Sequence, residues 1–151
     1  MKNFTIKDIF YQTAGGAVLL SVKAFRECVG PDADNEDKTQ AVLQLLSYLP
    51  CGNIWRYCDE SPSVELCASK TRPAAPFWAS YSPCSIQEAF NAIRFYCLGD
   101  EYPVKTLAGY STYKGVTTEL YDARPFTLEV SREWAEQQRW NLPACSAEVR
   151  A

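Results

Sequence analysis

Apolar residues recur at helical spacing over much of the chain up to Gly99. Residues three and four positions apart share one face of an α-helix, so each series predicts a helix with one buried side. The first helix is predicted from Thr5 to Val29, with a kink or break at Gly15 and Gly16. The three series are Val18, Val22, Phe25 and Val29; Val42, Leu45, Leu46 and Leu49; and Ile86, Ala89, Phe90, Ile93 and Cys97.

Capping residues indicate where the second and third helices begin and end. Asp34 or Asn35 can accept a hydrogen bond from the first turn of the second helix. Ser85 and Glu88 have the spacing of a capping box for the third helix, and Gly99 ends that helix. These signals make residues 85–99 the clearest helix in the chain.

Two segments between these helices carry proline signals. Ser61 followed by Pro62 has the pattern of an N-cap and a first-turn proline, which predicts a short helix over residues 62–69. The stretch "KTRPAAPFWASYSPC", residues 70–84, contains several prolines, and we interpret it as a loop.

The amino-acid composition changes after Pro103, where Val, Thr and Tyr become frequent. Strands are predicted in "VKTLAGYSTY", "VTTELYD" and "FTLEV", with a hairpin turn at Lys114 and Gly115. Ser131 then begins a last helix that reaches about Trp140. Because the helices come first and the strands later, the sequence predicts an α+β fold. In detail, we expect N-terminal helices packed on a small C-terminal antiparallel sheet, with a final helix, in a single globular domain over residues 1–151.

Composition and charge narrow the function classes. The 151 residues are 47% hydrophobic and 22% charged, which is ordinary globular usage. The net charge is −3 and Lys and Arg are scattered, so direct binding to nucleic-acid phosphates is not expected. No apolar run has the length of a membrane span, and the N-terminus lacks the pattern of an export signal. We therefore expect a cytoplasmic protein that does not bind membranes.

The chain contains no histidine. Histidine is the usual general base, the usual partner of a serine or cysteine nucleophile and a common metal ligand. Catalytic triads that need histidine are therefore excluded within this chain, as are zinc sites that contain it.

The seven cysteines offer another candidate chemistry. Their odd number prevents complete pairing within one chain, and we expect reduced thiols in a cytoplasm. Cys51, Cys58, Cys67 and Cys84 lack the two-to-four-residue ligand spacing of zinc knuckles. We interpret the cysteines mainly as core residues, such as Cys97 on its helical stripe, and expect no cofactor. A zinc site assembled from distant turns stays open as an alternative.

Aromatic residues indicate a binding surface. The loop contains Phe77, Trp78 and Tyr81 beside Arg72, a composition typical of interface centres. Trp140 in the last helix is a further candidate. Two alternatives stay open for Phe77 and Trp78, because the rings can face a partner or fold back into the core.

We therefore predict a small non-catalytic protein that binds another protein, and self-association into a homo-oligomer is compatible with the sequence. An inhibitor, an adaptor or an immunity-type protein fits this description, including a phage or mobile-element protein that blocks a host defence enzyme. The alternatives are a histidine-free enzyme that uses Cys, Asp, Glu, Tyr and Arg, and a zinc-stabilised interaction module.

Overall fold

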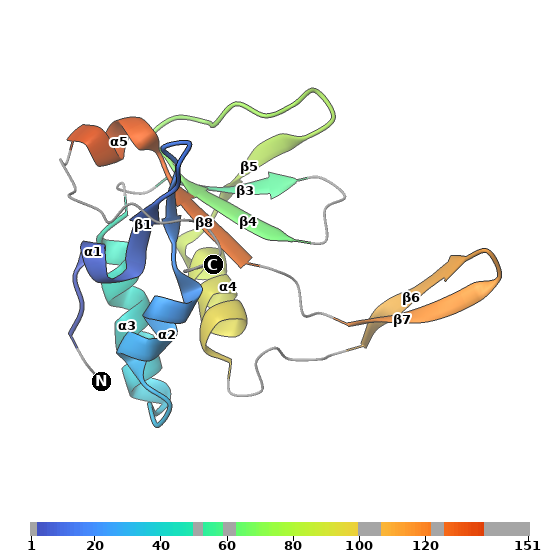
Figure 1. The fold of residues 1–151 in the computed structure, drawn as a ribbon, viewed down its shortest axis with the longest axis horizontal. Helices are drawn as coiled ribbons and strands as arrows, with labels where there is room; N and C mark the ends of the chain where they lie inside the picture. Colours follow the sequence, from blue (N-terminus) through green and yellow to red (C-terminus); the bar gives the residue numbers. More distant parts are fainter. Residues whose placement is uncertain (1–2, 50–52, 59–62, 100–106, 122–125, 138–151) are drawn as a thin grey trace.

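A computed structural model describes residues 3–49, 53–58, 63–99, 107–121 and 126–137. These residues form a six-stranded sheet, a separate two-stranded sheet and helices along the chain (Figure 1). In chain order the elements are α1 (Ile6–Ile9), β1 (Phe10–Gln12), β2 (Val18–Leu20), α2 (Val22–Val29), α3 (Asn35–Ser47), β3 (Ile54–Cys58), β4 (Val64–Ala68), β5 (Ser80–Cys84), α4 (Ile86–Leu98), β6 (Leu107–Tyr113), β7 (Val116–Tyr121), β8 (Phe126–Val130) and α5 (Arg132–Gln137).

The six-stranded sheet has the order β1-β2-β8-β4-β3-β5 and mixes parallel and antiparallel pairs. Its only parallel pair, within the described ranges, joins β4 to β8, where Leu66 lies beside Leu128. The expected small C-terminal antiparallel sheet is therefore wrong. The strands come from the whole described chain, and the last strand lies between two that precede it. The prediction that helices precede strands was wrong because short strands near the N-terminus lack a distinctive local period.

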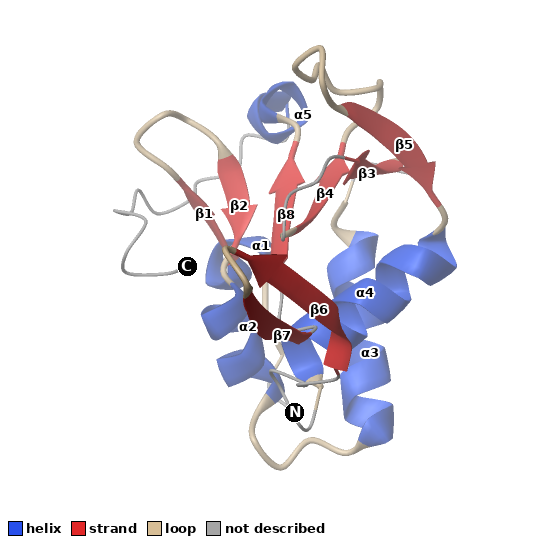
Figure 2. Ribbon diagram, turned by 90° about the vertical axis from the view of Figure 1, so that its right-hand side faces the viewer, coloured by secondary structure: helices blue, strands red, loops and turns tan. Residues whose placement is uncertain are grey.

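The main helices cover one face of this sheet. Figures 1 and 2 show α2, α3 and α4 grouped on the same side of the strands. The core forms between them, where Phe25, Leu45 and Ile93 from the helices pack with Leu128 and Val130 from β8. All five side chains have no exposed surface, so burial of apolar area holds the two layers together.

The capping residues place the middle helices as predicted. Asp34 accepts a hydrogen bond from the backbone N–H of Asp37 and begins α3. Ser85 accepts one from the backbone N–H of Glu88, and α4 then runs to Leu98 before Gly99. These predictions are confirmed because a cap depends on residues only three positions apart.

The predicted helix from Thr5 to Val29 is wrong in its middle. The structure has the short helix α1, then the β1–β2 hairpin, and then α2. Gly16 has a φ of +87°, a left-handed conformation that favours glycine, and it lies in the hairpin loop. The two glycines therefore mark a turn between strands and not a kink within a helix.

The short helix predicted over residues 62–69 is also wrong, because Val64–Ala68 forms β4. This strand lies inside the sheet between β3 and β8. Pairing on both edges satisfies its backbone groups, and burial of Val64, Leu66 and Ala68 adds apolar contacts. The pairing and the apolar contacts involve residues far away in sequence, so the local pattern of Ser61 and Pro62 could not indicate them.

The hairpin predicted at Lys114 and Gly115 is confirmed. Both residues have positive φ values, 50° and 77°, as a tight hairpin turn requires. The strands on either side, β6 and β7, form their own two-stranded sheet. Figure 1 shows this hairpin standing apart from the six-stranded sheet.

No helix in the described part of the chain is long and apolar enough to cross a membrane.

Two leucines on α3 provide a test of the packing between helices and sheet. Leu45 is fully buried, whereas Leu43 is 47% exposed. We expect Leu45→Ala to lower the free energy of unfolding by about 2–5 kcal/mol, because it leaves a cavity in the core. Leu43→Ala should change it by less than about 0.5 kcal/mol. Urea denaturation followed by circular dichroism measures both, and equal effects would contradict the burial of this helix.

Candidate functional site

The sheet has an outer face, opposite the helices α2, α3 and α4, that carries polar and aromatic side chains. Successive residues of a strand point to opposite faces. The neighbours of the core residues therefore point outward from four adjacent strands. They are Trp55 and Tyr57 on β3, Glu65 and Cys67 on β4, Tyr81 on β5, and Thr127 and Glu129 on β8.

The segment 69–79, here called the aromatic loop, crosses from β4 to β5. Both strands pair antiparallel with β3, so they are parallel to each other and the loop must return along the sheet. Its first residues are held near the start of β3. Trp55 donates from Nε1 to the Ser69 carbonyl at 3.0 Å, and the Asn53 side chain donates to the Lys70 carbonyl at 2.9 Å.

Arg72 shows on which side the aromatic loop passes. Its guanidinium carbon lies 5.6 Å from the centre of the Trp55 ring, a cation–π distance. Because Trp55 follows the core residue Ile54, its ring belongs to the outer face. The loop therefore leaves the sheet over the outer face, and it arches away before β5 begins (Figure 1).

A tight turn presents Phe77 and Trp78 at the end of this loop. The Ala79 N–H donates to the Pro76 carbonyl at 3.0 Å, which closes a β-turn with the two aromatic residues at its centre. Phe77 is 96% exposed and Trp78 is 66% exposed. Their rings pack edge to face with centroids 5.0 Å apart. The alternative in which these rings fill the core therefore does not hold.

The structure places the predicted binding residues in two regions, the outer face of the sheet and the turn of the aromatic loop. Arg72 is exposed and lies over Trp55, and Tyr81 is half-buried on the outer face with its ring 5.0 Å from that of Tyr57. Phe77 and Trp78 project from the turn instead of joining them. Trp140 lies outside the described residues.

Burial and mutual repulsion control the charges on the outer face. Burial, together with the nearby carboxylates of Glu129 and Glu65, raises the pKa of Cys67 to about 12. Burial, with Cys67 and the same two carboxylates, raises the pKa of Tyr81 to about 12. Both groups are therefore neutral at pH 7. A thiol that stays protonated is a poor nucleophile, so this cluster is not typical of cysteine catalysis.

Glu129 is a half-buried carboxyl group of this face. Burial raises its pKa, and the guanidinium of Arg132 opposes that shift. Arg132 also donates to the Gly15 carbonyl at 2.9 Å, which holds the start of α5 against the β1–β2 hairpin. Glu129 thus carries a half-buried charge next to a tertiary contact.

The described cysteines occupy different environments. Cys67, Cys84 and Cys97 are buried, whereas Cys28 is partly buried and Cys58 is exposed. Core packing therefore applies to Cys97, as predicted, but not to Cys58. Among the residues that the structure describes, no group of three or more Cys, Asp and Glu side chains could hold a metal ion.

Sequence reasoning missed the outer-face residues Trp55, Tyr57, Glu65 and Glu129. The alternation in "FTLEV" could have placed Thr127 and Glu129 on one face of a strand. No local pattern, however, could show that β8 lies beside β4 and brings Glu129 next to Cys67.

Comparisons of the chain with protein-family models, curated proteins and solved structures found no significant match.

Glu129 provides a test of the charge on the outer face. Its raised folded-state pKa means that ionisation is costlier in the folded than in the unfolded protein, so it destabilises the fold at neutral pH. The loss of stability begins as pH rises through the unfolded pKa of about 4.3 and is complete above the folded pKa. Glu129→Gln should therefore unfold at higher urea concentration than wild type at pH 7, and the difference should disappear at acidic pH. The exposed Glu136→Gln is the control, and a destabilised Glu129→Gln at pH 7 would contradict the expectation.

Thiol labelling tests the arrangement of the cysteines. Among the described cysteines of the native protein, N-ethylmaleimide should modify Cys58 first, because it is exposed, and Cys97 last, because burial keeps it inaccessible and raises its pKa to about 12. Peptide mass spectrometry after timed quenching gives each rate. In urea the rates at Cys58 and Cys97 should become similar. Equal rates in the native protein would show that α4 is not packed as described.

Proposed function

We propose that this protein binds another protein through the aromatic loop and has no catalytic activity of its own. The observation that carries the proposal is the exposed Phe77–Trp78 pair at the centre of a closed turn. Exposed aromatic patches are unusual on a monomer's surface and frequently mark interaction sites.

The energetics of the turn support a role in binding. Prolines at positions 73 and 76 restrict the backbone, so ordering the loop on binding costs less conformational entropy. The two rings already pack on each other at 5.0 Å and can enter a partner's pocket as one unit. Trp and Arg are enriched among the residues that dominate binding energy, and this loop offers Trp78 and Arg72.

Charge indicates the chemistry of the partner. The segment 69–84 contains Lys70 and Arg72 and has no Asp or Glu. We propose that the partner has an apolar pocket for the two rings and acidic residues at its rim, since opposite charges favour encounter. An inhibitor or immunity-type protein of the cytoplasm would use such a surface, and this includes a mobile-element protein directed against a host defence enzyme.

Substitution of Trp78 tests the proposal. Trp78→Ala should leave the melting temperature within a degree or two, because the side chain is mainly exposed, and should weaken binding by about 2 kcal/mol, roughly thirtyfold. The immobilised wild-type protein and variant are compared for proteins retained from the same native lysate, by quantitative mass spectrometry. Leu43→Ala, which removes an exposed apolar side chain from α3, is the control.

If the proposal is correct, at least one lysate protein is retained by immobilised wild type and by Leu43→Ala but not by Trp78→Ala. If no retained protein depends on Trp78, the binding proposal for this loop is wrong. If Trp78→Ala instead unfolds the protein, the exposed position of the ring is wrong and the proposal fails with it. Lys70→Glu, at an exposed position, tests the charge argument and should weaken retention of the same protein most strongly at low salt.

A further inference from the structure

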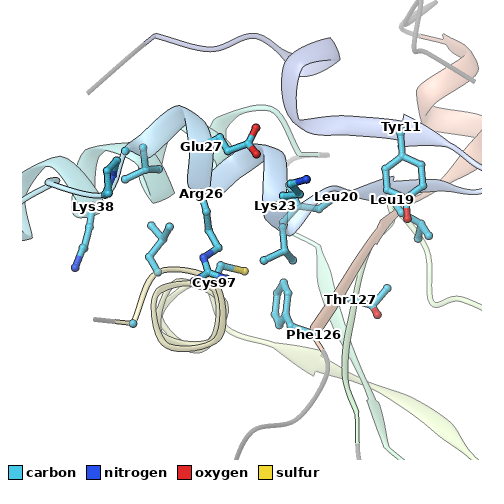
Figure 3. A pocket seen from close by; sticks show the side chains of 16 residues that line it. Tyr11, Leu19, Leu20, Lys23, Arg26, Glu27, Lys38, Cys97, Phe126 and Thr127 are labelled. Carbon is cyan, nitrogen blue, oxygen red and sulfur yellow. The ribbon is translucent and has the colours of Figure 1, made fainter. Parts of the chain in front are cut away.

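A cleft opens where β2 separates from β8. The two strands pair at only two positions, Val18 with Val130 and Leu19 with Glu129. Ser21 then caps α2, and the chain turns away from the sheet. Phe126 and Leu128 of β8 still pair with β4 on one side, but they do not pair with β2 on the other. The space between α2, β8 and the end of α4 is a cavity of about 940 Å³ (Figure 3).

The cavity has an apolar wall. Leu20 and Val22 line it from β2 and α2, Leu98 from α4, and Phe126 from β8. Figure 3 shows the Phe126 ring facing the space below α2. The volume lies within the range of about 300–1,000 Å³ found for small-molecule sites, and such sites combine apolar walls with a few polar groups.

The charged residues described in its lining are mainly cationic. Lys23, Arg26 and Lys38 line the cavity against one acidic residue, Glu27. In Figure 3 the Arg26 side chain reaches from α2 toward Cys97, whereas Glu27 extends away from Arg26. Among the lining residues that the structure describes, three cations stand against one anion, a net charge of +2.

The thiol of Cys97 lines the cavity and adds no negative charge at neutral pH. Burial raises the pKa of Cys97 to about 12, although the guanidinium of Arg26 opposes that shift. The thiol therefore stays neutral below Arg26. An anion that enters the cleft meets the positive potential of these side chains beside apolar walls, and solvent screens part of that potential because Lys23 and Arg26 are exposed.

We propose that this cleft binds a small anionic amphiphile, a carboxylate on a hydrocarbon chain. The hydrocarbon packs against Val22, Leu98 and Phe126, and the carboxylate faces Arg26 with Lys23 and Lys38 contributing positive potential. Arginine suits this role because its planar guanidinium can donate two parallel hydrogen bonds to one carboxylate. This site is separate from the aromatic loop, so the two proposals can fail independently.

Calorimetric titration of the full chain with dodecanoate, below its micelle concentration, tests the proposal. We expect saturable binding of one dodecanoate per protein. Dodecanol lacks the charge, dodecyltrimethylammonium reverses it, and butanoate lacks most of the hydrocarbon. Each should bind at least roughly tenfold more weakly, the equivalent of about 1.4 kcal/mol. Absence of saturable dodecanoate binding, or equal binding of dodecanol or the cation, would overturn the proposal.

Variants then locate the site. Arg26→Gln should weaken dodecanoate binding roughly tenfold, because it removes a charge-assisted hydrogen-bond donor. Val22→Trp should weaken it by filling the apolar side of the cleft. Lys7→Gln, on α1 and outside the cavity lining, is the matched control and should bind like wild type.

Circular dichroism melting shows whether each variant is folded. If Arg26→Gln unfolds, Lys23→Gln at an exposed position takes its place and should weaken binding in the same direction. Wild-type affinity in a folded charge variant together with wild-type affinity in a folded Val22→Trp would place the amphiphile elsewhere and refute the assignment to this cleft.

Discussion

The parallel pairing of β4 with β8 is the constraint on which the rest of this structure depends. It places the last strand of the sheet between the N-terminal hairpin and the strands β4, β3 and β5. Among the described strands, β8 alone pairs with both parts. Leu128 and Val130 are fully buried at this join, so the same strand also completes the core under the helices. Pairing across such a sequence separation closes a long loop, which favours slow folding.

The positions of both proposed binding regions follow from where the polypeptide enters and leaves this sheet. Because β4 and β5 are parallel, their connection must return along the sheet, and the turn at Phe77 and Trp78 is part of that connection. Because β2 leaves β8 after two paired residues, α2 starts at a distance from β8 and the cleft lies between them. A fold can carry binding residues in loops, and at places where two strands separate, without disturbing its core.

The two regions differ in what holds their polar groups. The aromatic loop is fixed at its beginning, where Trp55 and Asn53 donate to loop carbonyls and Arg72 lies over the Trp55 ring. At its tip, the Ala79 N–H donates to the Pro76 carbonyl. In the cleft, Arg26 stands on a regular helix beside the buried thiol of Cys97. A site on a helix is more rigid than one on a loop, which suits a small ligand, whereas a loop suits a protein surface.

The sequence by itself determined the features that depend on neighbours within one turn. The cap at Ser85, the end of α4 near Gly99 and the hairpin at Lys114 were predicted because their hydrogen bonds and φ values are local. Its prolines and aromatics also located a candidate binding loop. Tertiary structure alone decided that Val64–Ala68 is a strand, that β8 pairs with β4 and that Trp78 is exposed. The physical reason is that strand pairing and burial depend on residues far away in sequence, which no local pattern records.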